Sequence, residues 1–251
     1  MSKKRTTIAK SSKTSRDAST GSPQKRTRKV TTINRPSSSF YHTQDLSSTL
    51  ERLTREAVRK SIERSFGHPS ITLRAAHANI AVGDWQSALL GIPQIASDAV
   101  WTKATVEMMN QNGMNAVQHH TGAWDISVIA ESGFGRHARH EVKVASPSQG
   151  RFQASFSPEQ CVKGNNLLFI VHPEPNSLDS SKFIHIGFND LMKLRESSAE
   201  KGASLWVQPE NTGKAALSVK LDVILGRPHS IITPRMLSID EFAAYAANGL
   251  R

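Results

Sequence analysis

The first ordered pattern of apolar and charged positions lies between Ser47 and Phe66. Apolar residues recur there at intervals of three or four between charged residues, and Gly67 followed by Pro69 ends the pattern. The apolar positions are Leu50, Leu53, Ala57, Val58 and Ile62. This spacing predicts an amphipathic surface helix, and a second helical pattern follows from about residue 70 to residue 90.

A third helical pattern begins at Ser97 or Asp98, either of which suits an N-cap. It ends at the Asn-Gly stop signal of residues 112–113. Glu107 lies on or beside the apolar stripe of this predicted helix. The predicted helix therefore carries an acidic side chain shortly before the apolar pattern changes from a helical period to that of a strand.

From Met114 onward the period of the apolar pattern changes to two. Residues 116–120, 125–130 and 139–145 are predicted to form consecutive strands. The continuous apolar run of residues 166–173 is typical of a strand that is buried on both faces. Further strands are expected over residues 183–188, 203–209 and 215–225, and helices over residues 189–201 and 238–248. This order predicts an α/β or α+β domain around one mixed sheet.

Length and composition limit the architecture further. The chain has 251 residues and 37% hydrophobic content, enough for one sizeable core, and no sequence repeat is found. No apolar stretch is long enough to span a membrane, and no signal peptide is recognised. A single cysteine, Cys161, excludes an internal disulfide. We expect a soluble intracellular protein, cytoplasmic or nucleoid-associated, or nuclear or organellar in a eukaryote.

The net charge of +11 is concentrated at the start of the chain. Residues 1–35 contain eleven Lys or Arg and one acid, Asp17, so this segment carries +10 and the rest of the chain +1. The segment is rich in Ser and Thr and too polar to fold alone, which predicts a disordered basic tail over residues 1–38. Such a tail can bind phosphate backbones by counterion release, or can serve solubility, nuclear import or organelle targeting.

Three charged residues fall inside the predicted hairpin: Asp125, Glu141 and Lys143. Because side chains alternate along a strand, Glu141 and Lys143 share a face. If the hairpin closes near Gly133, Asp125 and Glu141 are each eight residues from the turn and stand opposite each other, with Cβ atoms about 4.5–5.5 Å apart. Two carboxylates at that distance repel unless a cation lies between them. A hard ion such as Mg²⁺, which prefers oxygen ligands, would remove the conflict.

These residues resemble the core of the PD-(D/E)XK nuclease superfamily. That family has an Asp at the start of one strand, a variable hairpin and Glu-X-Lys in the next strand, often after a helix with a further Glu. The matching positions are Asp125, residues 141–143 and Glu107, within about residues 98–173. The order of the predicted helix, strands and glycine turns carries the resemblance. Trp124 replaces the family's proline, and no QxxxY element of the RecB-like branch is found.

The resemblance implies a restriction-endonuclease-like fold, a mixed β-sheet flanked by helices, in one domain over residues 39–251 with its catalytic core at about 97–173. It also implies metal-dependent hydrolysis of phosphodiester bonds in DNA, of a restriction or a repair and recombination type. Asp125, Glu141 and the carbonyl of Val142 would ligate Mg²⁺, for which Mn²⁺ would substitute. Glu107 would complete that site or hold a second ion. Lys143 would orient or deprotonate the attacking water and stabilise charge on the phosphate.

Other interpretations of the same residues stay open. Asp125 suits a strand edge or turn, and Glu141 with Lys143 suits the solvated face of an ordinary hairpin. Glu107 can form a mere surface ion pair with Lys103, four residues earlier. The same fold can bind DNA without cutting it, or serve a ribonuclease or a tRNA-directed toxin. A homodimer is also left open.

The histidines around the hairpin do not predict a transition-metal site, because no Cys is near and the strand period splits neighbouring His between faces. We interpret the hairpin tip as a polar loop that could also touch a phosphate backbone. The histidines concerned are His119, His120, His137 and His140, and the tip also contains Arg136 and Arg139. For base recognition the C-terminal third offers Trp206, Gln208, Asn211 and Lys214.

Overall fold

The computed structural model describes most of one compact unit, which spans Pro36–Arg251. The residues described are 41–120, 123–129, 138–157, 160, 164–174, 177–195, 201–207 and 214–247. The predicted basic tail, the predicted turn at Gly133, and His137, Gln208 and Asn211 lie outside these ranges. No helix of the described ranges is long and apolar enough to cross a membrane.

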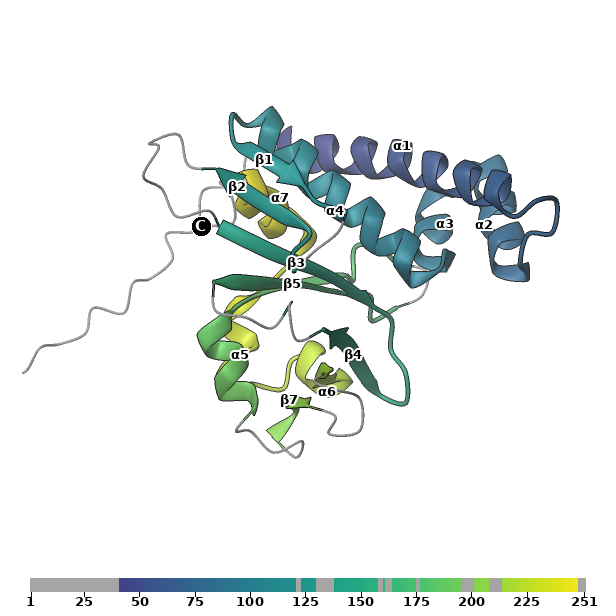
Figure 1. The fold of residues 1–251 in the computed structure, drawn as a ribbon. Coiled ribbons are helices and arrows are strands. Elements are labelled where there is room, and N and C mark those ends of the chain that lie inside the picture. The colour runs from purple at the N-terminus through teal and green to yellow at the C-terminus, as the bar shows by residue number, and fades with distance from the viewer. Residues whose placement is uncertain are drawn as a thin grey trace, which may run out of the picture. The chain divides into compact units, whose positions relative to one another are not determined.

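A six-stranded mixed sheet forms the centre of this unit (Figure 1). Its order is β1 (Asn115–Gln118), β2 (Ile126–Ile129), β3 (Ala138–Ala145), β5 (Asn165–Val171), β6 (Lys182–Gly187) and β9 (Met236–Leu237). β3 and β5 are parallel, and every other neighbouring pair is antiparallel. The predicted α/β class, with a mixed sheet flanked by helices, is confirmed.

Helices cover one face of this sheet (Figure 1). The helices against the strands are α4 (Gln94–Gln111) and α7 (Ile239–Ala247). α1 (Tyr41–Arg64) packs on these two, and α2 (Ile71–Ala81) and α3 (Trp85–Gly91) pack on α1. Val142 and Val144 of β3 point into the core beneath them, together with Leu168 and Ile170 of β5. Alternation along the strand therefore turns Glu141 and Lys143 to the opposite face.

A second, three-stranded sheet packs on that opposite face. Its order is β4 (Arg151–Phe156), β8 (Ala215–Lys220) and β7 (Ala203–Val207), and α5 (Phe188–Arg195) and α6 (Leu221–Ile224) accompany it. The expectation of one sheet was therefore wrong. Strand β4 was overlooked although Phe152, Ala154 and Phe156 alternate with polar residues and are buried. The predicted strand over residues 215–225 is β8 followed by α6.

Several helix boundaries differ from the prediction, and α1 begins at Tyr41 rather than at Ser47. The helical pattern of residues 70–90 is divided into α2 and α3 by Gly83, whose φ of +85° suits glycine, and by Asp84, which caps α3. α4 begins at Gln94 with Pro93 at the N-cap position, so neither Ser97 nor Asp98 is the cap. Asp98 therefore lies inside the helix, and its carboxylate is free to contact the sheet.

Candidate functional site

The site lies where β2 separates from β3. Ile126 pairs with His140 in the antiparallel register, and the N–H of Asp125 donates to the carbonyl of His140 at 2.9 Å. Asp125 precedes Ile126 and lies beside Glu141: its carboxylate accepts from the N–H of Val142, the next residue of β3. Lys143 follows two residues later on the same face of β3.

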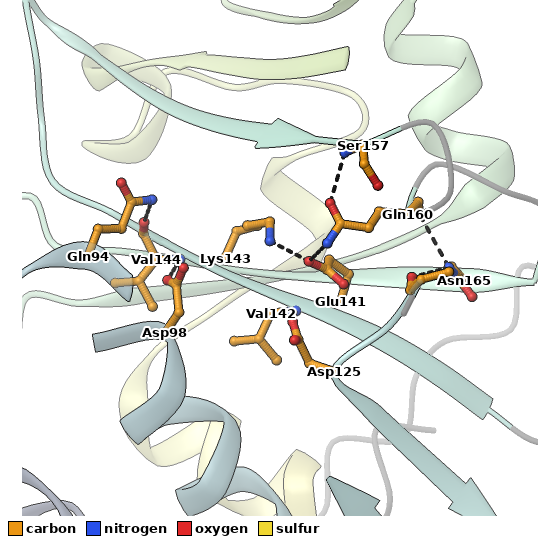
Figure 2. Close-up of polar contacts among 11 residues, drawn as sticks. Gln94, Asp98, Asp125, Glu141, Val142, Lys143, Val144, Ser157, Gln160 and Asn165 are labelled. Carbon is orange, nitrogen blue, oxygen red and sulfur yellow. Dashed lines mark hydrogen bonds and ion pairs between the residues drawn. The ribbon is translucent and has the colours of Figure 1, made fainter. Parts of the chain in front are cut away.

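Side chains take the place of a strand partner along the edge of β3 beyond this point (Figure 2). The N–H of Val142 donates to Asp125 Oδ2 and the N–H of Val144 donates to Asp98 Oδ1, both at 2.8 Å. Gln94 Nε2 donates to the carbonyl of Val144 at 2.5 Å. The backbone that carries Glu141 and Lys143 is therefore held by two side chains of α4 and by that of the residue before β2.

Glu141 is buried, with 2% of its surface exposed. Its Oε1 forms an ion pair with Lys143 Nζ and accepts a hydrogen bond from Gln160 Nε2 at 2.6 Å. Its Oε2 is buried and has no hydrogen-bond partner among the described residues. Burial raises the pKa of Glu141 to about 7; Lys143 opposes this effect and the neighbouring Asp125 adds to it.

Gln160 connects this carboxylate to two other segments (Figure 2). Its Oε1 accepts from the N–H of Ser157 at 2.8 Å, which fixes the orientation of the amide. Its carbonyl accepts from Asn165 Nδ2 at 3.3 Å, and the same nitrogen donates to the carbonyl of Ala123 at 2.7 Å. Sequence reasoning missed Gln160 because it lies between β4 and β5, outside any periodic pattern.

The structure does not bring Glu107 to this group. Glu107 forms an ion pair with Arg52 of α1, and 26% of its side chain is exposed. Nine residues separate Asp98 from Glu107, and at about 100° per residue they project from opposite sides of α4. The carboxylate that α4 supplies to the site is that of Asp98. Lys103, the predicted partner of Glu107, pairs instead with Glu56.

The surroundings of Asp98 change the pKa of its carboxyl group. Burial raises its pKa to about 6, and the nearby carboxylate of Asp125 adds to this effect. The hydrogen bond from Val144 and the charge of Lys143 act in the opposite direction. The charges of Asp125 and Lys143 therefore act on both Asp98 and Glu141: Asp125 raises the pKa of each carboxyl group and Lys143 lowers it.

Within the described ranges, no three His, Cys, Asp or Glu side chains are grouped closely enough to hold a metal ion. An ion at this position would therefore need backbone, water or substrate oxygens besides Asp125 and Glu141, which is how Mg²⁺ is commonly bound. Glu141 Oε2 is a buried oxygen without a partner, and it fits such an ion. Val142 also fits, because its N–H faces Asp125 and a residue's carbonyl points to the same side of its strand.

Two of the histidines around the hairpin have different partners. His119 Nε2 lies 2.8 Å from Ser127 Oγ. His140 is fully buried on the helical face, where its Nδ1 lies 3.2 Å from His185 Nε2. His140 is therefore not part of a polar loop, because β3 already begins at Ala138. Trp206 is 38% exposed on β7, the strand of the second sheet that also contains Leu205.

Comparison with known sequences gives no family assignment. No protein-family model matches the chain, and no curated protein matches it. The function must therefore be argued from the geometry of Asp125, Glu141 and Lys143.

Proposed function

We propose that the protein is a metal-dependent endonuclease that hydrolyses phosphodiester bonds in DNA. The observation that supports this most directly is the grouping of Asp125, Glu141 and Lys143: Asp125 accepts from the N–H of Val142, and Glu141 on the same strand pairs with Lys143. A carboxylate pair, a lysine on the same face and a buried carboxylate oxygen without a partner are what such chemistry requires.

Each residue has a role in this proposal. Asp125, Glu141 and the carbonyl of Val142 would hold Mg²⁺ or Mn²⁺, which when bound supplies Lewis-acid activation of the phosphate and of a water molecule. Lys143 pairs with Glu141 Oε1; with the carboxylate held by an ion, its ammonium would face the attacking water or the phosphate. Gln160 keeps the Glu141 carboxylate in one orientation.

The proposal includes the restriction-endonuclease-like fold. Support comes from the order of α4, β1, β2 and β3, followed by β5 parallel to β3, with helices on one face. Further support is that Asp125 directly precedes β2 and Glu141 lies within β3. Glu107 is left out of the proposed site because its carboxylate pairs with Arg52, and Asp98 is included as the helix carboxylate.

The test is cleavage of supercoiled plasmid, linear DNA and RNA by purified protein, with Mg²⁺, with Mn²⁺ and with a chelator. Glu141→Gln and Lys143→Ala should each lose cleavage by about 10²-fold or more, the usual effect of removing one electrostatic contact to a transition state. The matched controls are Glu174→Gln and Lys201→Ala, at exposed positions. Binding measured with chelator should persist in all four variants.

Three outcomes separate this proposal from its rivals. Cleavage of RNA alone would favour a ribonuclease or a tRNA-directed toxin that uses the same residues. Binding of DNA without cleavage under any metal condition would favour a DNA-binding module and overturn the enzymatic proposal. Full activity of Glu141→Gln would remove Glu141 from the mechanism.

A further inference from the structure

A second group of polar side chains lies on the same face of the sheet, next to the carboxylate pair. Ser127 stands directly opposite Arg139 in the register of β2 and β3. This pair is two residues along the strands from Asp125 and Glu141, a distance of about 7 Å. That is on the scale of one nucleotide step along a nucleic-acid strand.

Arg139 is held in place by an aromatic ring. Its guanidinium carbon lies 3.9 Å from the centroid of the Trp124 ring, a cation–π contact. His119 approaches the same indole edge-on, with ring centroids 5.9 Å apart, and its Nε2 contacts Ser127 Oγ at 2.8 Å. The four side chains therefore form one connected cluster, which we call the Arg139 cluster.

The Arg139 cluster has donors and no carboxylate. Among the described residues, Arg139 has no ion-pair partner, and the Trp124 Nε1–H has no acceptor. A guanidinium offers five N–H donors in a planar fork that matches phosphate oxygens. Arg139 is also only partly buried, so an anion can reach it. A bound anion would supply the acceptor that these donors lack among the described residues.

We propose that the Arg139 cluster binds the phosphate of the nucleic-acid strand next to the one cleaved at Asp125 and Glu141. This rests on the proposed function for the identity of the strand. Trp124 orients the guanidinium and limits its rotamers, so that less freedom is lost when Arg139 engages a phosphate. Arg139 also offsets the negative charge of Asp98, Asp125 and Glu141, which would otherwise repel a polyanion.

The experiment compares Arg139→Ala and Arg139→Lys with wild type and with Arg74→Ala. Arg74 is exposed on α2 and carries the same charge, so Arg74→Ala controls for net charge alone. Binding of a short fluorescent DNA oligonucleotide of mixed sequence is measured by anisotropy in chelator at several salt concentrations. Arg139→Ala should weaken binding several-fold for any base sequence and lower the log–log salt slope by about one.

Arg139→Lys should bind between wild type and Arg139→Ala, because a lysine keeps the charge and loses the planar fork. Trp124→Phe should bind nearly as wild type, and Trp124→Ala should bind more weakly, because only the former keeps a ring under Arg139. Thermal melting identifies any variant that fails to fold. If Arg139→Ala fails to fold, the affinity of Arg139→Lys for DNA tests the phosphate subsite instead.

The outcomes separate this inference from the proposed function. If Arg139→Ala binds with wild-type affinity and salt slope while wild type cleaves DNA, the phosphate subsite is wrong and the nuclease stands. If Arg139→Ala weakens binding while wild type never cleaves, the subsite stands on a binding module. An equal loss in Arg74→Ala would reduce the effect to net charge and overturn the subsite.

Discussion

Asp98 of α4 and Asp125, the residue before β2, accept hydrogen bonds from alternate amides of the same strand. The donors are the N–H groups of Val144 and Val142, and both distances are 2.8 Å. The two carboxylates therefore accept hydrogen bonds from the β3 amides that lie beyond the end of its pairing with β2. Because Glu141 and Lys143 lie between and beside these amides, the position of both side chains depends on Asp98 and Asp125.

The first prediction concerns the helix that supplies the carboxylate. Asp98→Ala leaves the Val144 N–H without a partner, which should cost about 1–3 kcal/mol of unfolding free energy, and should lower cleavage because the edge of β3 is no longer fixed. Asp98→Asn keeps an oxygen acceptor and should lose less stability. Urea unfolding followed by a plasmid-cleavage assay measures both effects.

Glu107→Gln is the contrasting variant in that experiment. It removes an ion pair with Arg52, whose side chain is 55% exposed, so it should cost less than about 1 kcal/mol and leave cleavage unchanged. If Glu107→Gln abolishes cleavage while Asp98→Ala does not, the helix carboxylate of the site is Glu107 and not Asp98.

The sequence predicted the register of β2 and β3, in which Ile126 pairs with His140, because a hairpin is a local structure. Residues equidistant from a turn must pair, so a count along the chain was sufficient. The mixed α/β class also followed from local periodicity, since most helices and strands carry their own pattern. Local patterns also explain why Asp98 was misassigned, because an acid near the start of an apolar helical pattern resembles an N-cap. Its partner, the N–H of Val144, is distant in sequence and is seen only in the folded structure.

Gln160 could not be predicted, because its contacts are long-range. Glu141 lies nineteen residues before it, across β4, and a glutamine between two strands has no periodic signal. The second sheet was missed on similar grounds: β4 pairs with β8, whose residues follow their partners by 59 to 69 positions, and a local pattern does not reveal such pairing. The face on which Glu141 lies was predicted, but the sheet that closes over part of that face was not.

The second prediction tests Gln160 as a positioning residue. Gln160→Ala removes the 2.6 Å hydrogen bond to Glu141 Oε1 and should raise the Mg²⁺ concentration needed for half-maximal cleavage, by about 10-fold on the scale of outer-shell effects. The maximal rate at saturating Mg²⁺ should fall less. Gln153→Ala, at an exposed position of β4, is the control. An equal loss of rate at every Mg²⁺ concentration would show that Gln160 does not act through the metal site.

The third prediction concerns His172, which is 2% exposed and whose Nδ1 lies 2.7 Å from Ser181 Oγ. Burial lowers the pKa of His172 from 6.5 to about 4. The stability that the neutral ring contributes is complete above pH 6.5 and is lost as the pH falls toward 4. His172→Asn does not titrate, so wild type should lose about 2 kcal/mol relative to this variant between pH 7 and pH 5.

Urea midpoints at half-unit pH intervals measure this difference. Ser181→Ala is the companion variant: it removes the hydrogen bond and keeps the titrating ring, so it should lower stability at every pH without changing the slope. If wild type and His172→Asn show parallel profiles between pH 7 and pH 5, the imidazole is not kept neutral by burial.

The last prediction concerns Glu141, whose pH dependence has the opposite sign. Burial raises its pKa from 4.5 to about 7, so the folded protein holds a proton that the unfolded chain releases. The stability gained from this proton is complete below pH 4.5 and is lost as the pH rises through 7. Measured in chelator, wild type should therefore lose about 2–3 kcal/mol relative to Glu141→Gln between pH 5 and pH 8.

Metal should reverse this loss. An ion that binds the folded protein requires the ionised carboxylate, so adding Mg²⁺ at pH 8 should raise the unfolding free energy of wild type by RT ln(1 + [Mg²⁺]/Kd). Glu141→Gln should show little of this gain, because its amide supplies no charge. Thermal melts with and without Mg²⁺ at pH 6 and pH 8 give the comparison. Equal stabilisation of wild type and Glu141→Gln would place any bound ion elsewhere in the molecule and leave the Asp125 and Glu141 pair without a metal.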